Sequence, residues 1–275
     1  MCAETRMVKV TCQDCGKEFE AMATTTLGVP IPVRRCCEPC AKGRYFREHQ
    51  AVEVERQETI SRIRKGWRET CGIPLIFQTS EFGTFERERQ PKAYDCCLAY
   101  AQGFNLAKPQ GYPSLVMFSE KCWGVGKSHL ACAIINHLLN KWNGVPRTRP
   151  VLFVSEPDLF RRIQATYNVA REDRGWRETE DDVMKELTTV PLLVIDDIGK
   201  EERGDPRFVQ RTLFAIVNGR YNNLLPLVLT ANLGEHGLRQ YLGAGQNEAS
   251  FDRLVAMTKG EFVAMTGKSY RRNAK

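Results

Sequence analysis

The sequence contains no apolar run of about 18 residues, the length that a helix needs to cross a membrane. Its first ten residues, MCAETRMVKV, also lack the apolar stretch of a secretory signal peptide. These absences exclude the membrane-spanning classes and predict a soluble, cytoplasmic protein that makes no membrane contact. The 275 residues are enough for one sizeable domain and a small appendage. The net charge of +7 favours contact with a polyanion or with an acidic partner.

Eleven cysteines are present, and five of them fall within residues 8–42. Two C-x2-C pairs stand out there, Cys12 with Cys15 and Cys37 with Cys40. Each such pair delivers two thiolates from one turn, and four thiolates complete the tetrahedral shell of Zn²⁺. A closed shell makes the metal structural, so residues 1–42 are expected to be a zinc-binding module that folds with its metal. Cys36 could replace Cys37 through C-x3-C spacing, although two matched pairs fit better.

A charged connector follows over residues 43–70. Ile60, Ile63 and Trp67 are spaced as one face of a helix, so a helical linker is expected. Its arginines could bind a nucleic-acid backbone, but a solvated linker face is favoured. The run Cys71-Gly72-Ile73-Pro74 should end this helix and open a domain over residues 71–275.

Residues 115–135 read LVMFSEKCWGVGKSHLACAII. This succession predicts a strand, a phosphate-binding P-loop and a helix. A nucleoside triphosphate needs a concave set of backbone N–H donors, and glycines let the chain curl closely enough to supply it. Lys127 would reach the β- and γ-phosphates, and the hydroxyl of Ser128 would bind Mg²⁺. The residues expected to hold the nucleotide are Gly124, Val125, Gly126, Lys127, Ser128 and His129.

The strict P-loop pattern also wants a glycine at position 121, where this chain has Lys121. A lysine costs roughly 1 kcal/mol or more if the backbone there needs positive φ, and less where the loop leaves the strand. A chance glycine turn and a P-loop that binds nucleotide but hydrolyses it poorly are the alternatives.

Further apolar runs at 150–155 and 191–199 and the run PLVLTAN predict more strands, separated by helical segments such as 206–223. The run PLLVIDDIG has no polar alternation, which indicates a strand covered on both faces in a parallel α/β sheet. Asp196 and Asp197 then lie at the end of the sheet where ligands bind. Asp196 would hold Mg²⁺ and Asp197 would polarise the attacking water. If its strand lies between the other two, Asn232 approaches the γ-phosphate.

The run 158–167, DLFRRIQATY, predicts a helix that packs on the sheet through Leu159, Phe160 and Ile163. Its arginines beside aromatic residues could instead hold single-stranded nucleic acid, and that question stays open.

The motifs GVGKSHLA, LLVIDDIG, VLTAN, SFDRLVAM and GKSYR occur in this order. Together with the preceding IPLIFQTSEFGTF, this set resembles the DnaC/DnaI-like helicase loaders of the AAA+ class and the related IstB transposition ATPases. The resemblance covers about residues 71–275 and implies a P-loop AAA+ parallel sheet flanked by helices. It gives Asn232 the sensor-1 role, makes Arg253 an arginine finger for a neighbouring subunit, and makes Arg271 a phosphate sensor. Asp197 stands where many AAA+ proteins have glutamate.

By this resemblance the protein would use ATP and Mg²⁺ to load a replicative helicase onto single-stranded DNA and would self-associate through its AAA+ domain. The zinc module lies outside the core likeness, and residues 1–70 are expected to grip the helicase. An IstB-like transposition helper is the close alternative. A zinc-dependent binding protein that keeps ATP as a structural ligand is another. A P-loop kinase ranks low, because no arginine-rich lid or acceptor site is evident.

Overall fold

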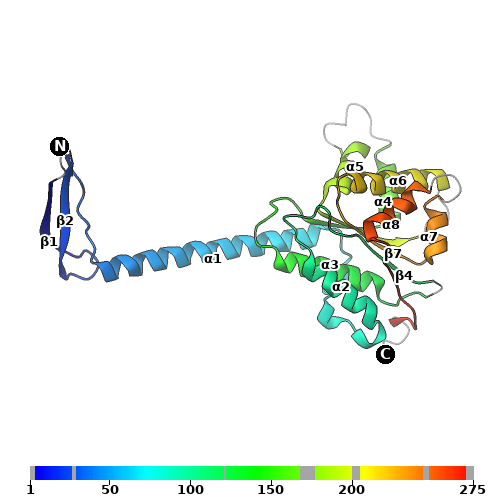
Figure 1. The fold of residues 1–275 in the computed structure, drawn as a ribbon, viewed down its shortest axis with the longest axis horizontal. Coiled ribbons are helices and arrows are strands. Elements are labelled where there is room, and N and C mark those ends of the chain that lie inside the picture. Colours follow the sequence, from blue (N-terminus) through cyan, green and yellow to red (C-terminus); the bar gives the residue numbers. More distant parts are fainter. Residues whose placement is uncertain are drawn as a thin grey trace. The chain divides into compact units, whose positions relative to one another are not determined.

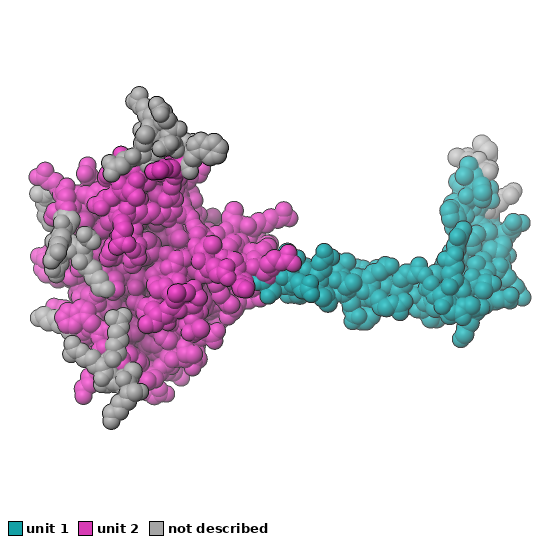
Figure 2. Space-filling view, turned by 180° about the vertical axis from the view of Figure 1, so that it is seen from behind, with its two compact units in different colours: residues 1–61 teal, residues 62–275 magenta. Residues whose placement is uncertain are grey.

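The computed structural model describes residues 4–26, 29–120, 122–167, 177–199, 205–243 and 248–270. Contacts divide the chain into two units, residues 1–61 and 62–275, which are coloured separately in Figure 2. Helix α1 (Glu38–Thr70) covers the whole of the expected linker and contributes residues to both units. No helix in the described ranges is both long enough and apolar enough to span a membrane.

Unit 1 is a small antiparallel sheet followed by the first part of α1. Its strands are β1 (Glu4–Thr11), β2 (Glu18–Thr26) and β3 (Val29–Pro30), in the order β1-β2-β3. The turn between β1 and β2 carries the first cysteine pair and needs Gly16, whose φ is +72°. Met7 pairs with Met22 across the strands, and both side chains are exposed.

Unit 2 contains a five-stranded sheet in the order β5-β6-β7-β4-β8, and every neighbouring pair is parallel. The α/β parallel sheet expected from the apolar runs is therefore confirmed. The strands are β4 (Leu115–Phe118), β5 (Val151–Ser155), β6 (Leu192–Ile198), β7 (Leu227–Ala231) and β8 (Phe262–Ala264). Strand β7 lies between β4 and β6, so the chain segments after these three strands are neighbours.

Helices cover both faces of this sheet (Figure 1). On one side α2 (Pro91–Gly103) packs with α3 (Lys127–Lys141), and Cys97 of α2 reaches Met117 of β4. On the other side, α4 (Glu156–Ala165), α5 (Glu180–Thr189), α6 (Pro206–Asn222) and α8 (Ala249–Thr258) share one apolar cluster with the strands. The remaining helical elements are α7 (Glu235–Tyr241) and the 3-10 turns η1 (Leu75–Phe77), η2 (Phe82–Thr84) and η3 (Arg87–Arg89).

Helix α4 begins after Ser155, its N-cap, whose hydroxyl oxygen accepts from the Asp158 N–H at 3.3 Å. Its apolar side chains Leu159, Phe160 and Ile163 are buried in the cluster. Arg162 pairs with Glu178 and Glu186, so that arginine is engaged within the protein. The packing interpretation of this helix holds for its apolar face.

The end of α1 is joined to the sheet at strand β5. Helix α1 stops at Thr70, as the Cys-Gly-Ile-Pro run predicts, and the Phe153 N–H then donates to the carbonyl of Cys71 at 2.7 Å. Gly72 has φ +89°, and a Cβ there would overlap the carbonyl oxygen of Phe153. Only glycine therefore lets the chain lie this close to β5.

Among the described residues, Arg220 of α6 is the largest side chain that is fully buried, and the sequence analysis did not single it out. Its guanidinium donates to the carbonyls of Leu187 (2.7 Å), Val190 (3.0 Å) and Pro226 (3.1 Å). Burial lowers the pKa of this arginine to about 9. The side chain satisfies carbonyls at the end of α5 and at the entry to β7, where the backbone has no regular partners.

Candidate nucleotide and metal sites

The phosphate loop connects β4 to α3 and depends on two glycines with positive φ. Gly124 has φ +70° and Gly126 has φ +101°. A Cβ at Gly124 would collide with the side chain of Ser269, and one at Gly126 with the ring of Phe85. Both glycines are therefore required by geometry and by close packing. Lys121 lies outside the described residues.

Lys127, the first residue of α3, is almost fully buried. Its Nζ donates to Ser119 Oγ at 2.5 Å and to Asn232 Oδ1 at 2.8 Å. Ser119 follows β4 and Asn232 follows β7, so the ammonium bridges the ends of neighbouring strands. This places one positive charge at the mouth of the loop, where a phosphate would bind.

Ser128 and Asp196 form an oxygen pair beside this charge. The Ser128 hydroxyl donates to Asp196 Oδ2 at 2.9 Å, and Thr230 Oγ1 donates to Asp196 Oδ1 at 2.6 Å. Two hydroxyls from α3 and β7 thus hold the buried carboxylate in one orientation. A serine hydroxyl and a carboxylate are hard oxygen ligands of the kind that Mg²⁺ takes beside a nucleotide, so the residues fit this metal.

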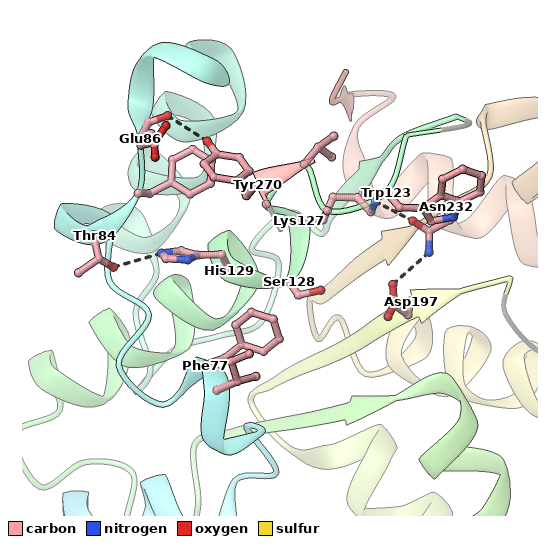
Figure 3. Close-up of a pocket in the computed structure, with 15 residues that line it drawn as sticks. Phe77, Thr84, Glu86, Trp123, Lys127, Ser128, His129, Asp197, Asn232 and Tyr270 are labelled. Atoms are coloured by element: carbon pink, nitrogen blue, oxygen red, sulfur yellow. Dashed lines mark hydrogen bonds between the residues drawn. The ribbon is translucent and has the colours of Figure 1, made fainter. Parts of the chain in front are cut away.

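Asp197 is turned out of its strand by an irregularity in β6. Pairing with β7 shifts register between Ile195 and Ile198, and Asp197 has φ 65°, which is rare for a residue with a side chain. Thr230 Oγ1 accepts from the Asp197 N–H at 2.8 Å, and Asn232 Nδ2 donates to Asp197 Oδ1 at 3.1 Å. The two adjacent aspartates consequently face different partners, Asp196 the serine and Asp197 the asparagine. Figure 3 shows the contact between Asp197 and Asn232.

Two supporting residues were missed by the sequence analysis. Thr230 is fully buried and serves both aspartates, and Glu156 is fully buried and accepts from the Gly199 N–H at 2.9 Å. Glu156 thereby holds the turn that follows Asp197, where Gly199 has φ +92°. No pattern in the sequence marks Thr230 or Glu156 as a site residue, because the hydrogen-bond partner of each is distant in the sequence.

A cavity of about 250 Å³ opens beside the loop (Figure 3). Gly124 to Ser128, Asp197 and Asn232 line one part of it, and Ile76, Phe77, Thr84, Phe85, Glu86, Trp123, His129 and Tyr270 complete the lining. Tyr270 is fixed there, since its N–H donates to the Gly124 carbonyl at 2.8 Å and its hydroxyl to the Glu86 carbonyl at 3.2 Å. The aromatic residues were also missed, although IPLIFQTSEFGTF was noticed as a motif.

Arg253 does not line this cavity. It lies on α8 with its guanidinium 5.3 Å from the Phe214 ring centre and 5.8 Å from that of Tyr221. It also donates to the Ala249 carbonyl at 3.2 Å. Arg271 lies outside the described residues.

The four cysteines of unit 1 come together. The sulfur atoms of Cys12, Cys15, Cys37 and Cys40 all lie within 4.8 Å of one another. Thiolates around a tetrahedral Zn²⁺ are about 3.8 Å apart, and the Cys15 and Cys37 sulfurs are 3.7 Å apart, so the set fits zinc. Cys36 is outside the cluster.

Hydrogen bonds further favour this arrangement. The Cys37 N–H donates to Cys12 Sγ at 3.3 Å. This bond is the largest of several hydrogen-bond effects that together lower the pKa of Cys12 to about 6, which favours the thiolate that a metal requires. The Cys36 sulfur instead accepts from Arg44 Nη2 at 3.4 Å. Arg44 also pairs with Asp14, which ties the first cysteine turn to α1.

Comparison with known proteins agrees with this geometry. The family described as IstB-like ATP binding protein matches residues 117–275. The replicative helicase loader DnaC of Buchnera aphidicola subsp. Baizongia pistaciae is 30% identical over 203 residues, covering 73% of each protein. The DnaC of Escherichia coli K12 is 25% identical over 224 residues, covering 81% of each.

Solved structures show the same fold. A crystal structure of the DnaC helicase loader matches with a TM-score of 0.53 and 21% identity, over 70% of this chain and 100% of that one. A crystal structure of DnaI matches with a TM-score of 0.53 and 18% identity, over 74% of this chain and 98% of that one. The strand order, the phosphate loop with its paired aspartates and these likenesses together show that the chain belongs to the DnaC-like, IstB-related family of ATP-binding AAA+ proteins.

Proposed function

We propose that this protein is an ATP-dependent loader that places a replicative helicase on single-stranded DNA. The observation that carries the proposal is the convergence of Lys127, the Ser128–Asp196 pair and the Asp197–Asn232 pair on one cavity. Lys127 binds the β- and γ-phosphates there, and Ser128 and Asp196 hold Mg²⁺. The metal, when bound, neutralises charge on the phosphates during transfer to water.

Hydrolysis needs a water aligned with the γ-phosphate. Asp197 accepts a hydrogen bond from that water and Asn232 keeps its carboxylate in place, at the 3.1 Å contact described above. Aspartate is one methylene shorter than glutamate, so the water sits closer to the strand than it would beside a glutamate. Thr230 and Glu156 hold the backbone on either side of this carboxylate.

Transition-state charge on the γ-phosphate needs a further cation. Arg253 does not line the nucleotide cavity of its own chain, which supports a role for this arginine at the nucleotide of a neighbouring subunit. Hydrolysis then depends on self-association through the AAA+ domain, and we assign Arg271 to phosphate sensing on the family pattern alone.

The relatives support the choice of partner. Several are named replicative helicase loader DnaC, and each named above is matched over more than two thirds of its length. Residues 1–42, with their zinc, and the linker 43–70 grip the helicase, while the AAA+ domain of residues 71–275 holds single-stranded DNA. Helicase loading by this protein takes place in the cytoplasm.

A second candidate is an IstB-like helper of transposition, favoured by the family match over residues 117–275. The two functions differ in partner. Retention of a hexameric replicative helicase by the immobilised full chain supports the loader, and retention of a transposase without the helicase supports the helper.

The test of the enzyme is ATP turnover by the full chain, with and without single-stranded DNA and helicase. Lys127→Ala should reduce turnover by at least about 100-fold, because it removes the cation at the transferred phosphate. Lys141→Ala, at the other end of α3, is the matched control and should retain turnover. Nucleotide binding without lysine-dependent turnover would mean that ATP is a structural ligand. Mixing Lys127→Ala with Arg253→Ala chains should restore part of the turnover if the arginine acts between subunits.

A further inference from the structure

The nucleotide cavity has two chemically different ends. Lys127, Asp197 and Asn232 bring charged and amide groups to one end. The other end is formed mainly by Ile76, Phe77, Phe85 and Tyr270. If the proposed function is right and phosphates occupy the first end, the flat purine base lies among the aromatic residues at the second.

Three polar side chains lie at this base end, Thr84, Glu86 and His129 (Figure 3). The Thr84 hydroxyl donates its hydrogen to the Glu81 carbonyl at 2.9 Å and accepts from the Glu81 N–H at 3.0 Å. The Glu86 carboxylate pairs with Arg89 Nε at 2.8 Å. The Thr84 hydroxyl hydrogen and one oxygen of the Glu86 carboxylate are therefore used within the protein. The His129 ring is the remaining polar side chain among these three.

The surroundings of His129 determine which ring nitrogen carries hydrogen. Nε2 lies 3.1 Å from the Glu81 carbonyl oxygen and 3.2 Å from Thr84 Oγ1. A carbonyl can only accept, so Nε2 is the N–H nitrogen, and in the neutral ring Nδ1 is then an acceptor. Among the described residues Nδ1 makes no hydrogen bond. The Phe85 ring packs against the imidazole, with the ring centres 5.3 Å apart and the planes inclined at 65°.

We propose that Nδ1 of His129 selects adenine by accepting a hydrogen bond from the 6-amino group of the base. A purine with oxygen at this position places an acceptor against an acceptor, as in guanine or hypoxanthine. Selection therefore rests on a tautomer fixed by Thr84 and Glu81 rather than on the size of the cavity.

The first test uses the unaltered full chain and isothermal titration calorimetry with Mg²⁺. ATP should bind about tenfold more tightly than purine riboside triphosphate, which lacks the 6-amino group, and more tightly still than ITP, whose 6-oxygen is an acceptor. Equal affinity for ATP and purine riboside triphosphate overturns the proposal. Failure of the chain to bind any of the three overturns the proposed function, and this inference with it.

The second test changes the residue. His129→Phe keeps a ring against Phe85 but has no acceptor, so its affinities for ATP and ITP should become equal within about twofold. His236→Phe, an exposed histidine on α7, is the control and should keep the preference of the unaltered chain. A His129→Phe chain that still prefers ATP by the original ratio contradicts the assignment, even if both affinities fall.

Discussion

The two units are stabilised in different ways. Within residues 1–61, the described side chains that are buried and apolar are Cys12, Ala21 and Ile60. Unit 2 instead buries apolar side chains from its strands and its flanking helices in a continuous cluster. So small a core cannot offset the conformational entropy of unit 1, and we expect a metal held by its four thiolates to supply the difference. With a core of this size, we expect unit 2 to fold without a metal.

Removal of zinc is the strongest way to separate the units. Because structural zinc contributes on the order of 10 kcal/mol to small modules of this kind, chelation should unfold unit 1 and leave unit 2 folded. Heteronuclear NMR spectra of the full chain, recorded before and after chelation, would report the folding of both units. Nucleotide affinity, measured on the same samples, would show whether the cavity of unit 2 is intact.

Substitutions make the same comparison without chelator. Cys37→Ser should lower the zinc content by close to one ion per chain, whereas Cys36→Ser should not, because only Cys37 belongs to the sulfur cluster. Equal zinc loss in both variants would mean that the ligand set is wrong.

Substitution of Arg220 tests how far the stability of unit 2 depends on one buried side chain. Arg220→Met leaves several buried carbonyls without donors, so the free energy of unfolding of unit 2 should fall by about 3–5 kcal/mol. Denaturant titration of the full chain measures this change. Arg211→Met, on the exposed face of the same helix, is the control and should change the stability by less than about 0.5 kcal/mol.

Thr230 should show a smaller effect, confined to the site. Thr230→Val removes the hydroxyl that joins the Asp196 carboxylate to the backbone of Asp197. The two lost hydrogen bonds together stabilise the orientation of the aspartates by about 1–3 kcal/mol. We expect turnover to fall by about tenfold or more while ATP affinity changes little. Thr230→Ser keeps the hydroxyl and should recover most of the turnover. Loss of affinity in step with turnover would indicate general damage to the cavity.

The sequence predicted those parts of the structure that depend on neighbours along the chain. Apolar runs defined the strands, and the run 191–199 became β6 with its two aspartates at the end of the sheet. The phosphate loop was visible because its glycines, Lys127 and Ser128 are consecutive. Parallel order could also be inferred, since a strand without polar alternation must be covered on both faces.

What could not be predicted depends on contacts between distant segments. Arg220 looks like any helical arginine until α5 and β7 bring carbonyls to it. Tyr270 gave no sign that it would close the base end of the cavity, because its contacts are with Gly124 and Glu86. The left-handed backbone of Asp197 likewise depends on the register shift between β6 and β7.

The contact between Cys71 and Phe153 has a consequence for solubility. Strand β5 ends the sheet on one side, and an uncovered outer strand offers unpaired N–H and carbonyl groups to other chains. The segment leaving α1 occupies the N–H of Phe153, and Gly72 lets it lie flat against this strand. The residues that follow α1 thus also shield part of one open border of this sheet from aggregation.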